Sequence, residues 1–108
     1  MKSQNLIEIA QENASDKRIR EITLTYYIYG FESFAKEIVK KHVAIMQKMR
    51  ENKAKIVKTE ATGGELYVTI AFQKSTENSP KSHDMNVFRL IQACFNTFTD
   101  FNPTVSLH

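Results

Sequence analysis

The sequence has too few cysteines and glycines to support several classes of functional site. A single cysteine, Cys94, excludes an internal disulfide and fits a reducing, intracellular setting. Three glycines, Gly30, Gly63 and Gly64, are too few for a glycine-rich loop that cradles phosphate. No run approaches the roughly 20 apolar residues of a membrane-spanning helix, and no apolar run follows the opening "MKSQN" to indicate a secretory signal. We therefore expect a cytoplasmic protein that does not engage a membrane.

The sequence also lacks the usual patterns of catalytic and metal-binding residues. The acidic residues are scattered singly, so no single element carries a pair spaced as a general acid and base. The spacing of His42, His83 and His108 does not suggest metal ligands, and His42 lies on an apolar stripe that favours a hydrogen-bonded core histidine. Cys94 also lies on an apolar stripe, which favours a buried structural thiol over a nucleophile. Although distant residues can still meet on folding, we predict a non-catalytic protein with no catalytic site, metal site or cofactor.

Length and charge limit the organisation of the chain. With 108 residues, 42% of them hydrophobic, the chain can form one domain around one core. The formal net charge of +3 favours an acidic partner only weakly. We treat residues 1–108 as a single α+β domain, with 1–20 as an N-terminal extension or short helix and 74–82 as a mobile loop.

Hydrophobic periodicity predicts a first strand, two helices with a hairpin between them, and a short final strand. The stretch "ITLTYYIYGF" alternates and predicts a strand at about 21–29, with Ile22, Leu24, Tyr26 and Ile28 on its inner face. A helix capped by Ser33 then runs to about residue 52, and its apolar stripe contains Phe34, Ile38, His42, Ile45 and Met49. A second helix starts at Ser82 or Asp84, and "TVSLH" can add a short edge strand.

Gly63 and Gly64 predict a tight hairpin between these helices. Its register pairs Val57 with Ile70 and Ala61 with Leu66. The residues expected on its inner face are Val57, Ala61, Leu66, Val68, Ile70 and Phe72. Those expected on its outer face are Ile56, Lys58, Glu60, Tyr67, Thr69 and Gln73.

The order strand, helix, strand, strand, helix, short strand predicts a ferredoxin-like plait. In this fold an antiparallel sheet carries two helices on one face, and its other face is left for solvent or a partner. The outer face would carry Tyr27, Tyr29 and Tyr67, with Thr25 and Thr69 beside them. We predict that these five residues form a binding surface, extended by a basic edge of Lys53, Lys55 and Lys58.

The outward tyrosines of the first and third strands resemble the arrangement in RNA-recognition motifs, whose aromatic side chains stack on bases. The resemblance covers the architecture only, because "GGELYVTIAF" lacks the basic residue and the second outward aromatic of that family's third strand. The leading interpretation is a binding or regulatory protein that uses this face for a protein partner or for homodimerisation. The alternative is a module that binds single-stranded RNA or DNA through the same tyrosines and the lysine edge.

Overall fold

The computed structural model describes residues 19–49, 54–73 and 80–108. The described residues form a four-stranded sheet of β1 (Glu21–Tyr27), β2 (Ala54–Thr62), β3 (Glu65–Phe72) and β4 (Thr104–Leu107). The strand order is β2-β3-β1-β4, and every neighbouring pair is antiparallel. The predicted helix in the N-terminal extension and Lys53 lie outside the described residues.

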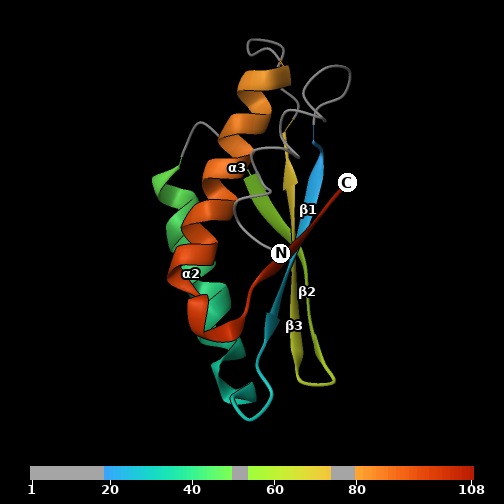
Figure 1. The fold of residues 1–108 in the computed structure, drawn as a ribbon, viewed down its shortest axis with the longest axis vertical. Coiled ribbons are helices and arrows are strands. Elements are labelled where there is room, and N and C mark those ends of the chain that lie inside the picture. Colours follow the sequence, from blue (N-terminus) through green and yellow to red (C-terminus); the bar gives the residue numbers. More distant parts are fainter. Residues whose placement is uncertain (1–18, 50–53, 74–79) are drawn as a thin grey trace.

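Two helices lie on the same side of this sheet, α2 (Ala35–Lys48) and α3 (Pro80–Thr97) (Figure 1). Two short 3-10 helices, η1 (Glu32–Phe34) and η3 (Thr99–Phe101), stand at the junctions β1–α2 and α3–β4. The predicted α+β class is therefore confirmed, with an antiparallel sheet and two helices. The 3-10 helices are additions to the simple order of a plait.

The alternation of β1 and β3 separates a core face from an outer face, as predicted. Every second residue of β1 is buried, and so is every second residue of β3. The fully or nearly fully buried strand residues are Ile22, Leu24, Tyr26, Leu66, Val68, Ile70 and Phe72. The helices complete this core with Ile38 and His42 from α2, and with Val87, Phe88, Leu90, Ile91, Cys94 and Phe98 from α3.

Both helices begin at other residues than the sequence predicted. Ser33 does not cap α2, because it lies inside η1 and the N-cap residue, Phe34, makes no side-chain capping bond. The second helix begins at Pro80, before the predicted start at Ser82 or Asp84. Proline suits a first helical turn because its missing N–H would have no intrahelical partner there.

Instead of capping a helix, Asp84 and its neighbour bind the segment that leads into β1. The Asp84 side chain is fully buried, and its Oδ1 accepts a hydrogen bond from the backbone N–H of Ile19 at 3.1 Å. The ring nitrogen Nε2 of His83 lies 2.8 Å from the carbonyl oxygen of Ile19. These two bonds satisfy both backbone groups of Ile19 inside the protein, which fixes the start of β1 against α3.

The hairpin turn has the predicted residues, but the strand pairing behind it shifts. Gly63 and Gly64 adopt positive φ angles of 61° and 80°, as a tight two-residue turn requires. A β-bulge between Ile56 and Lys58 then pairs Ile56 with Ile70. The predicted pairing of Val57 with Ile70 is therefore wrong: Ile56 packs against the core, and Val57 is 48% exposed.

The one-sided cover of the sheet predicts opposite effects for two adjacent substitutions. Val68→Asp should lower the free energy of unfolding by about 3 kcal/mol or more, because it places an unpaired carboxylate in the core. Thr69→Asp should cost less than about 1 kcal/mol, since Thr69 faces outward and lies opposite Lys58. Urea denaturation of both variants measures the difference. Equal losses would contradict the separation into a core face and an outer face.

Candidate functional site

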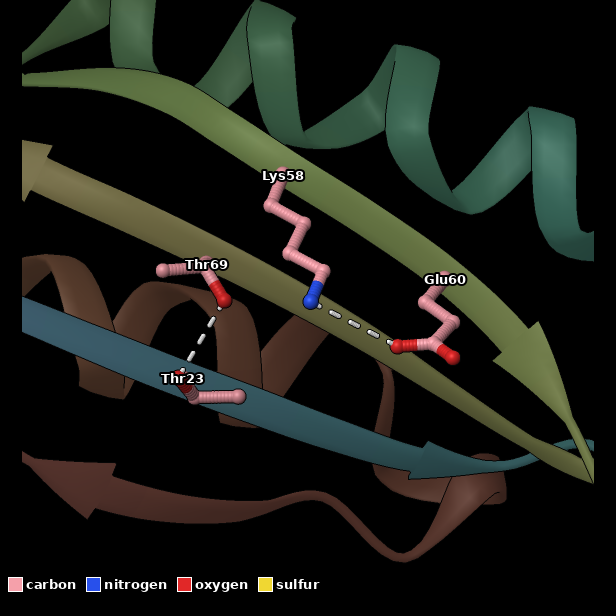
Figure 2. Close-up of polar contacts among 4 residues, drawn as sticks. All are labelled: Thr23, Lys58, Glu60 and Thr69. Atoms are coloured by element: carbon pink, nitrogen blue, oxygen red, sulfur yellow. Dashed lines mark hydrogen bonds and ion pairs between the residues drawn. The ribbon is translucent and has the colours of Figure 1, made fainter.

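The outer face of the sheet is lined by short hydroxyl side chains. Thr23 lies opposite Thr69 on β3 and Ser106 on β4, and Thr25 lies opposite Tyr67 and Thr104. The hydroxyl oxygens of Thr23 and Thr69 are 3.2 Å apart and share a hydrogen bond, which Figure 2 shows across the two strands. These hydroxyl groups make the middle of the outer face polar, so this face can remain in contact with water.

The two tyrosines at the end of β1 form a stacked, exposed pair. Tyr27 is 53% exposed and Tyr29 is 69% exposed, and their ring centroids are 6.4 Å apart with an interplanar angle of 19°. The Tyr29 side chain lies on the hairpin turn, where a Cβ added to Gly64 would come within 3.0 Å of Tyr29 Cδ2. Gly64 therefore allows both the positive φ and the close approach of the ring, which holds the pair against a rigid turn.

Tyr67 lies on the same face, but its hydroxyl is already engaged. It donates a hydrogen bond to the carboxylate of Glu65, which lies directly opposite Tyr27. Accepting this bond, Glu65 raises the pKa of Tyr67 above its ordinary value, so the phenol remains protonated at neutral pH. The structure thus places all three predicted tyrosines on one face and brings the rings of Tyr27 and Tyr29 into contact.

The described lysines of the predicted basic edge lie farther along the sheet than the tyrosine pair. Lys55 is opposite Ala71 and Lys58 is opposite Thr69, whereas the hairpin end of β2 and β3 carries Glu60 and Glu65. The Nζ of Lys58 is 3.8 Å from Oε1 of Glu60, and both side chains are more than half exposed (Figure 2). Carboxylates therefore separate the lysines from the exposed tyrosine rings.

A second group of exposed aromatic side chains was not predicted. Phe31 and Phe34 stack with ring centroids 5.8 Å apart, and Phe101 meets both rings edge-on at 6.3 and 6.4 Å. Phe34 was expected on the apolar stripe of the helix, but it lies in η1 and is 46% exposed. The sequence feature that points to this group is the pair of phenylalanines in "GFESF". Their meeting with Phe101 depends on how two distant loops approach each other.

The core contains a buried polar cluster of Tyr26, His42 and Cys94. The Tyr26 hydroxyl is 2.7 Å from His42 Nε2, and Cys94 Sγ is 3.5 Å from His42 Nδ1. All three side chains are fully buried. Burial lowers the pKa of His42 to about 4 and raises the pKa of Cys94 to about 12, so the imidazole is neutral and the thiol protonated. A protonated thiol without access to solvent is a poor nucleophile. The predicted burial of Cys94 and the predicted hydrogen bonding of His42 in the core are confirmed.

The part of the chain that the structure describes contains no group of three or more His, Cys, Asp or Glu residues arranged to hold a metal ion. Its helices are also too short or too polar to cross a bilayer.

Comparison of the chain with protein-family models, curated proteins and solved structures finds no significant match.

The buried imidazole predicts a loss of stability in mild acid. The pKa of His42 is about 4 in the folded chain and about 6.5 when unfolded, so the unfolded state binds the proton first as pH falls. This contribution is fully present above pH 6.5 and declines as pH falls toward 4, by about 3 kcal/mol in total. Urea denaturation between pH 8 and pH 4 should show the decline. His42→Phe, which cannot titrate, should lack it, whereas His108→Gln at the exposed C-terminus should retain it; an unchanged pH profile in His42→Phe would contradict the assignment.

Proposed function

We propose that this chain is a non-catalytic binding or regulatory protein that contacts a protein partner, or a second copy of itself, through its outer sheet face. The observation that carries the proposal is the stacked pair of Tyr27 and Tyr29, each more than half exposed. A tyrosine ring offers a large apolar surface, and its hydroxyl tolerates water before a partner covers it. Such side chains are enriched among the residues that dominate protein interfaces.

Pre-organisation strengthens this proposal. Tyr27 belongs to a central strand, and Tyr29 rests on Gly64 of the hairpin turn. The backbone N–H of Ile28, between the two tyrosines, donates to the carbonyl oxygen of Gly64 at 2.8 Å. Because the rings are already held in place, binding would cost little additional conformational entropy.

The local charge favours a polypeptide over a nucleic acid. Glu65 lies directly opposite Tyr27, and Glu60 lies opposite Tyr67. A phosphate backbone that brought bases onto these rings would pass close to both carboxylates and be repelled. A polypeptide partner can instead place amides, hydroxyls or basic side chains there.

The alternative function, binding of single-stranded RNA or DNA, draws support from a different part of the face. Lys55 and Lys58 are exposed on β2, and Lys58 lies opposite Thr69 on the outer face. Together with Lys53, whose position is not described, they could contact phosphates.

The proposal also includes a cytoplasmic setting, which the free, buried thiol of Cys94 supports.

Truncation of outer and inner tyrosines should separate binding from folding. We expect the Tyr27→Ala, Tyr67→Ala double variant to keep a cooperative melt and lose about 1 kcal/mol or less per residue, because both rings face outward. The same variant should lose self-association, measured as mass by light scattering, or binding to an identified protein partner. An anchor of this kind typically contributes about 2 kcal/mol or more to an interface.

The matched control is Tyr26→Ala, one residue from Tyr27 on the inner face. Removing this fully buried ring should lower the free energy of unfolding by about 3 kcal/mol or more. A wild-type chain that stays monomeric excludes the second copy as partner and leaves a different polypeptide. Association that survives in the outer double variant would refute the role of the tyrosines.

Salt dependence distinguishes the alternative function. With oligo(dT) or oligo(U) of about 12 nucleotides, a length within the range of known single-strand sites, we expect no binding at low salt. If binding does occur, its affinity should fall steeply as salt is added, because neutralised phosphates release counterions. Replacing Lys53, Lys55 and Lys58 by glutamine should then weaken binding and flatten the salt slope by about 0.7 per lysine that contacts a phosphate. This result would favour nucleic acid over protein.

A further inference from the structure

Three phenylalanines from three segments form an exposed group at one end of the molecule, which we call the phenylalanine cluster: Phe31, Phe34 and Phe101. Phe31 follows β1, Phe34 belongs to η1 and Phe101 belongs to η3. Phe31 is 55% exposed and Phe34 is 46% exposed, whereas Phe101 is partly buried and packs against the core. Two of the three rings therefore extend the core outward into solvent.

The cluster is held in place by its surroundings. The Phe31 N–H donates to the carbonyl oxygen of Ile28 at 2.7 Å, and the Phe34 N–H donates to that of Phe31 at 2.9 Å. The Phe101 N–H donates to the carbonyl oxygen of Phe98, a buried residue, at 3.0 Å. Local backbone bonds thus fix all three positions before any partner binds.

The charge around the cluster is mainly negative. The β1–α2 connection, the hairpin turn and η3 come together here, because Ile28 bonds to Gly64 and the Phe31 and Phe34 rings meet Phe101. Glu32, Glu65 and Asp100 come from these segments, and Glu37 follows in the first turn of α2, where Lys36 is the basic residue nearest to the cluster in the sequence. Acidic residues therefore predominate here, although the chain has a net charge of +3. Glu32 and Asp100 are exposed, and Glu32 Oε2 accepts a hydrogen bond from the N–H of Gly30 at 3.3 Å.

We propose that the phenylalanine cluster is a docking site for a polypeptide segment that combines arginine or lysine with bulky apolar side chains. Apolar side chains of the partner pack on the exposed rings of Phe31 and Phe34. A guanidinium or ammonium group is attracted to the ring faces and pairs with the carboxylates of Glu32 and Asp100. The same carboxylates repel the phosphates of nucleic acids and of anionic lipids, so the charge selects a basic polypeptide.

This surface is separate from the tyrosine-bearing face, and the proposal does not depend on it. The two surfaces are connected through Gly30, which lies between Tyr29 and Phe31 and has a φ of 85°. The outer double variant Tyr27→Ala, Tyr67→Ala should therefore leave docking at the phenylalanine cluster intact. Loss of one activity without the other separates failure of this proposal from failure of the tyrosine face.

The test is an NMR titration of the ¹⁵N-labelled full chain with three blocked peptides of equal length. One alternates arginine with leucine, one glutamate with leucine and one arginine with glycine. We expect saturable binding of the arginine–leucine peptide, with shifts of the amide signals of residues 30–34 and 100–102. The other two peptides should bind at least about tenfold more weakly, since each lacks one of the two required chemistries.

Two double variants examine the two parts of the site. Phe31→Ser with Phe34→Ser should weaken the arginine–leucine peptide at least about tenfold. Glu32→Gln with Asp100→Asn keeps side-chain size and should weaken binding several-fold and reduce its salt dependence. The matched controls are Val57→Ser and Glu60→Gln, an exposed apolar and an exposed acidic residue of β2, and neither should change the affinity. If the Phe31→Ser, Phe34→Ser variant does not fold, the Glu32→Gln, Asp100→Asn variant still tests whether the peptide binds at the phenylalanine cluster.

Several results would overturn the proposal. Equal binding of the arginine–leucine and glutamate–leucine peptides would show that the carboxylates do not select the partner. Shifts confined to other parts of the chain, or no saturable binding at millimolar peptide, would remove the docking site. Binding to neutral phosphatidylcholine vesicles that depends on Phe31 and Phe34, without peptide binding, would assign the rings to a membrane surface instead.

Discussion

The hydrogen bond between Tyr26 and His42 fixes how the helices lie on the sheet. It joins β1 to α2 inside the core, and the thiol of Cys94 brings α3 to the other nitrogen of the same imidazole. A neutral imidazole has one donor and one acceptor nitrogen, and both a phenol and a thiol can donate or accept, so either tautomer is satisfied. Because an unpaired polar group here would be costly, the three elements have little freedom to slide past one another.

This inward anchor determines what the protein shows to solvent. With Tyr26 directed into the core, strand alternation turns Tyr27 outward, and the tight turn at Gly64 supports Tyr29 beside it. The chain then passes through Gly30, which has a φ of 85°, into Phe31 and Phe34 of the phenylalanine cluster. One continuous stretch, "YYIYGFESF", thus supplies the buried Tyr26, two of the three outward tyrosines and two of the three rings of the phenylalanine cluster. Tyr67 comes from β3 and Phe101 from η3.

The fold was more predictable from the sequence than the candidate sites were. Strict alternation in β1 and β3 and two apolar helical stripes specify the layers, and these predictions are confirmed. The bulge at Val57 could not be predicted, because Ile56 and Val57 are both apolar and β-branched, and either could face the core. Helical spacing alone places Phe34 on the apolar stripe, where it would be expected in the interior. Only the position of η1 and the approach of Phe101 show that its ring lies at the surface. The role of the tyrosines stays a prediction, since a strand pattern indicates exposure but not a partner.

The β-bulge in β2 also affects whether the edge strands of the sheet can pair with other chains. β2 is an outer strand of nine residues, long enough to recruit another chain by backbone pairing. The extra residue at Val57 breaks the even row of donors and acceptors, and Lys55 and Lys58 place charge on either side of it. The opposite margin, β4, is only four residues long and follows Pro103, which has no N–H to donate. Both edge strands of the described sheet therefore carry features that disfavour open-ended backbone pairing with further chains.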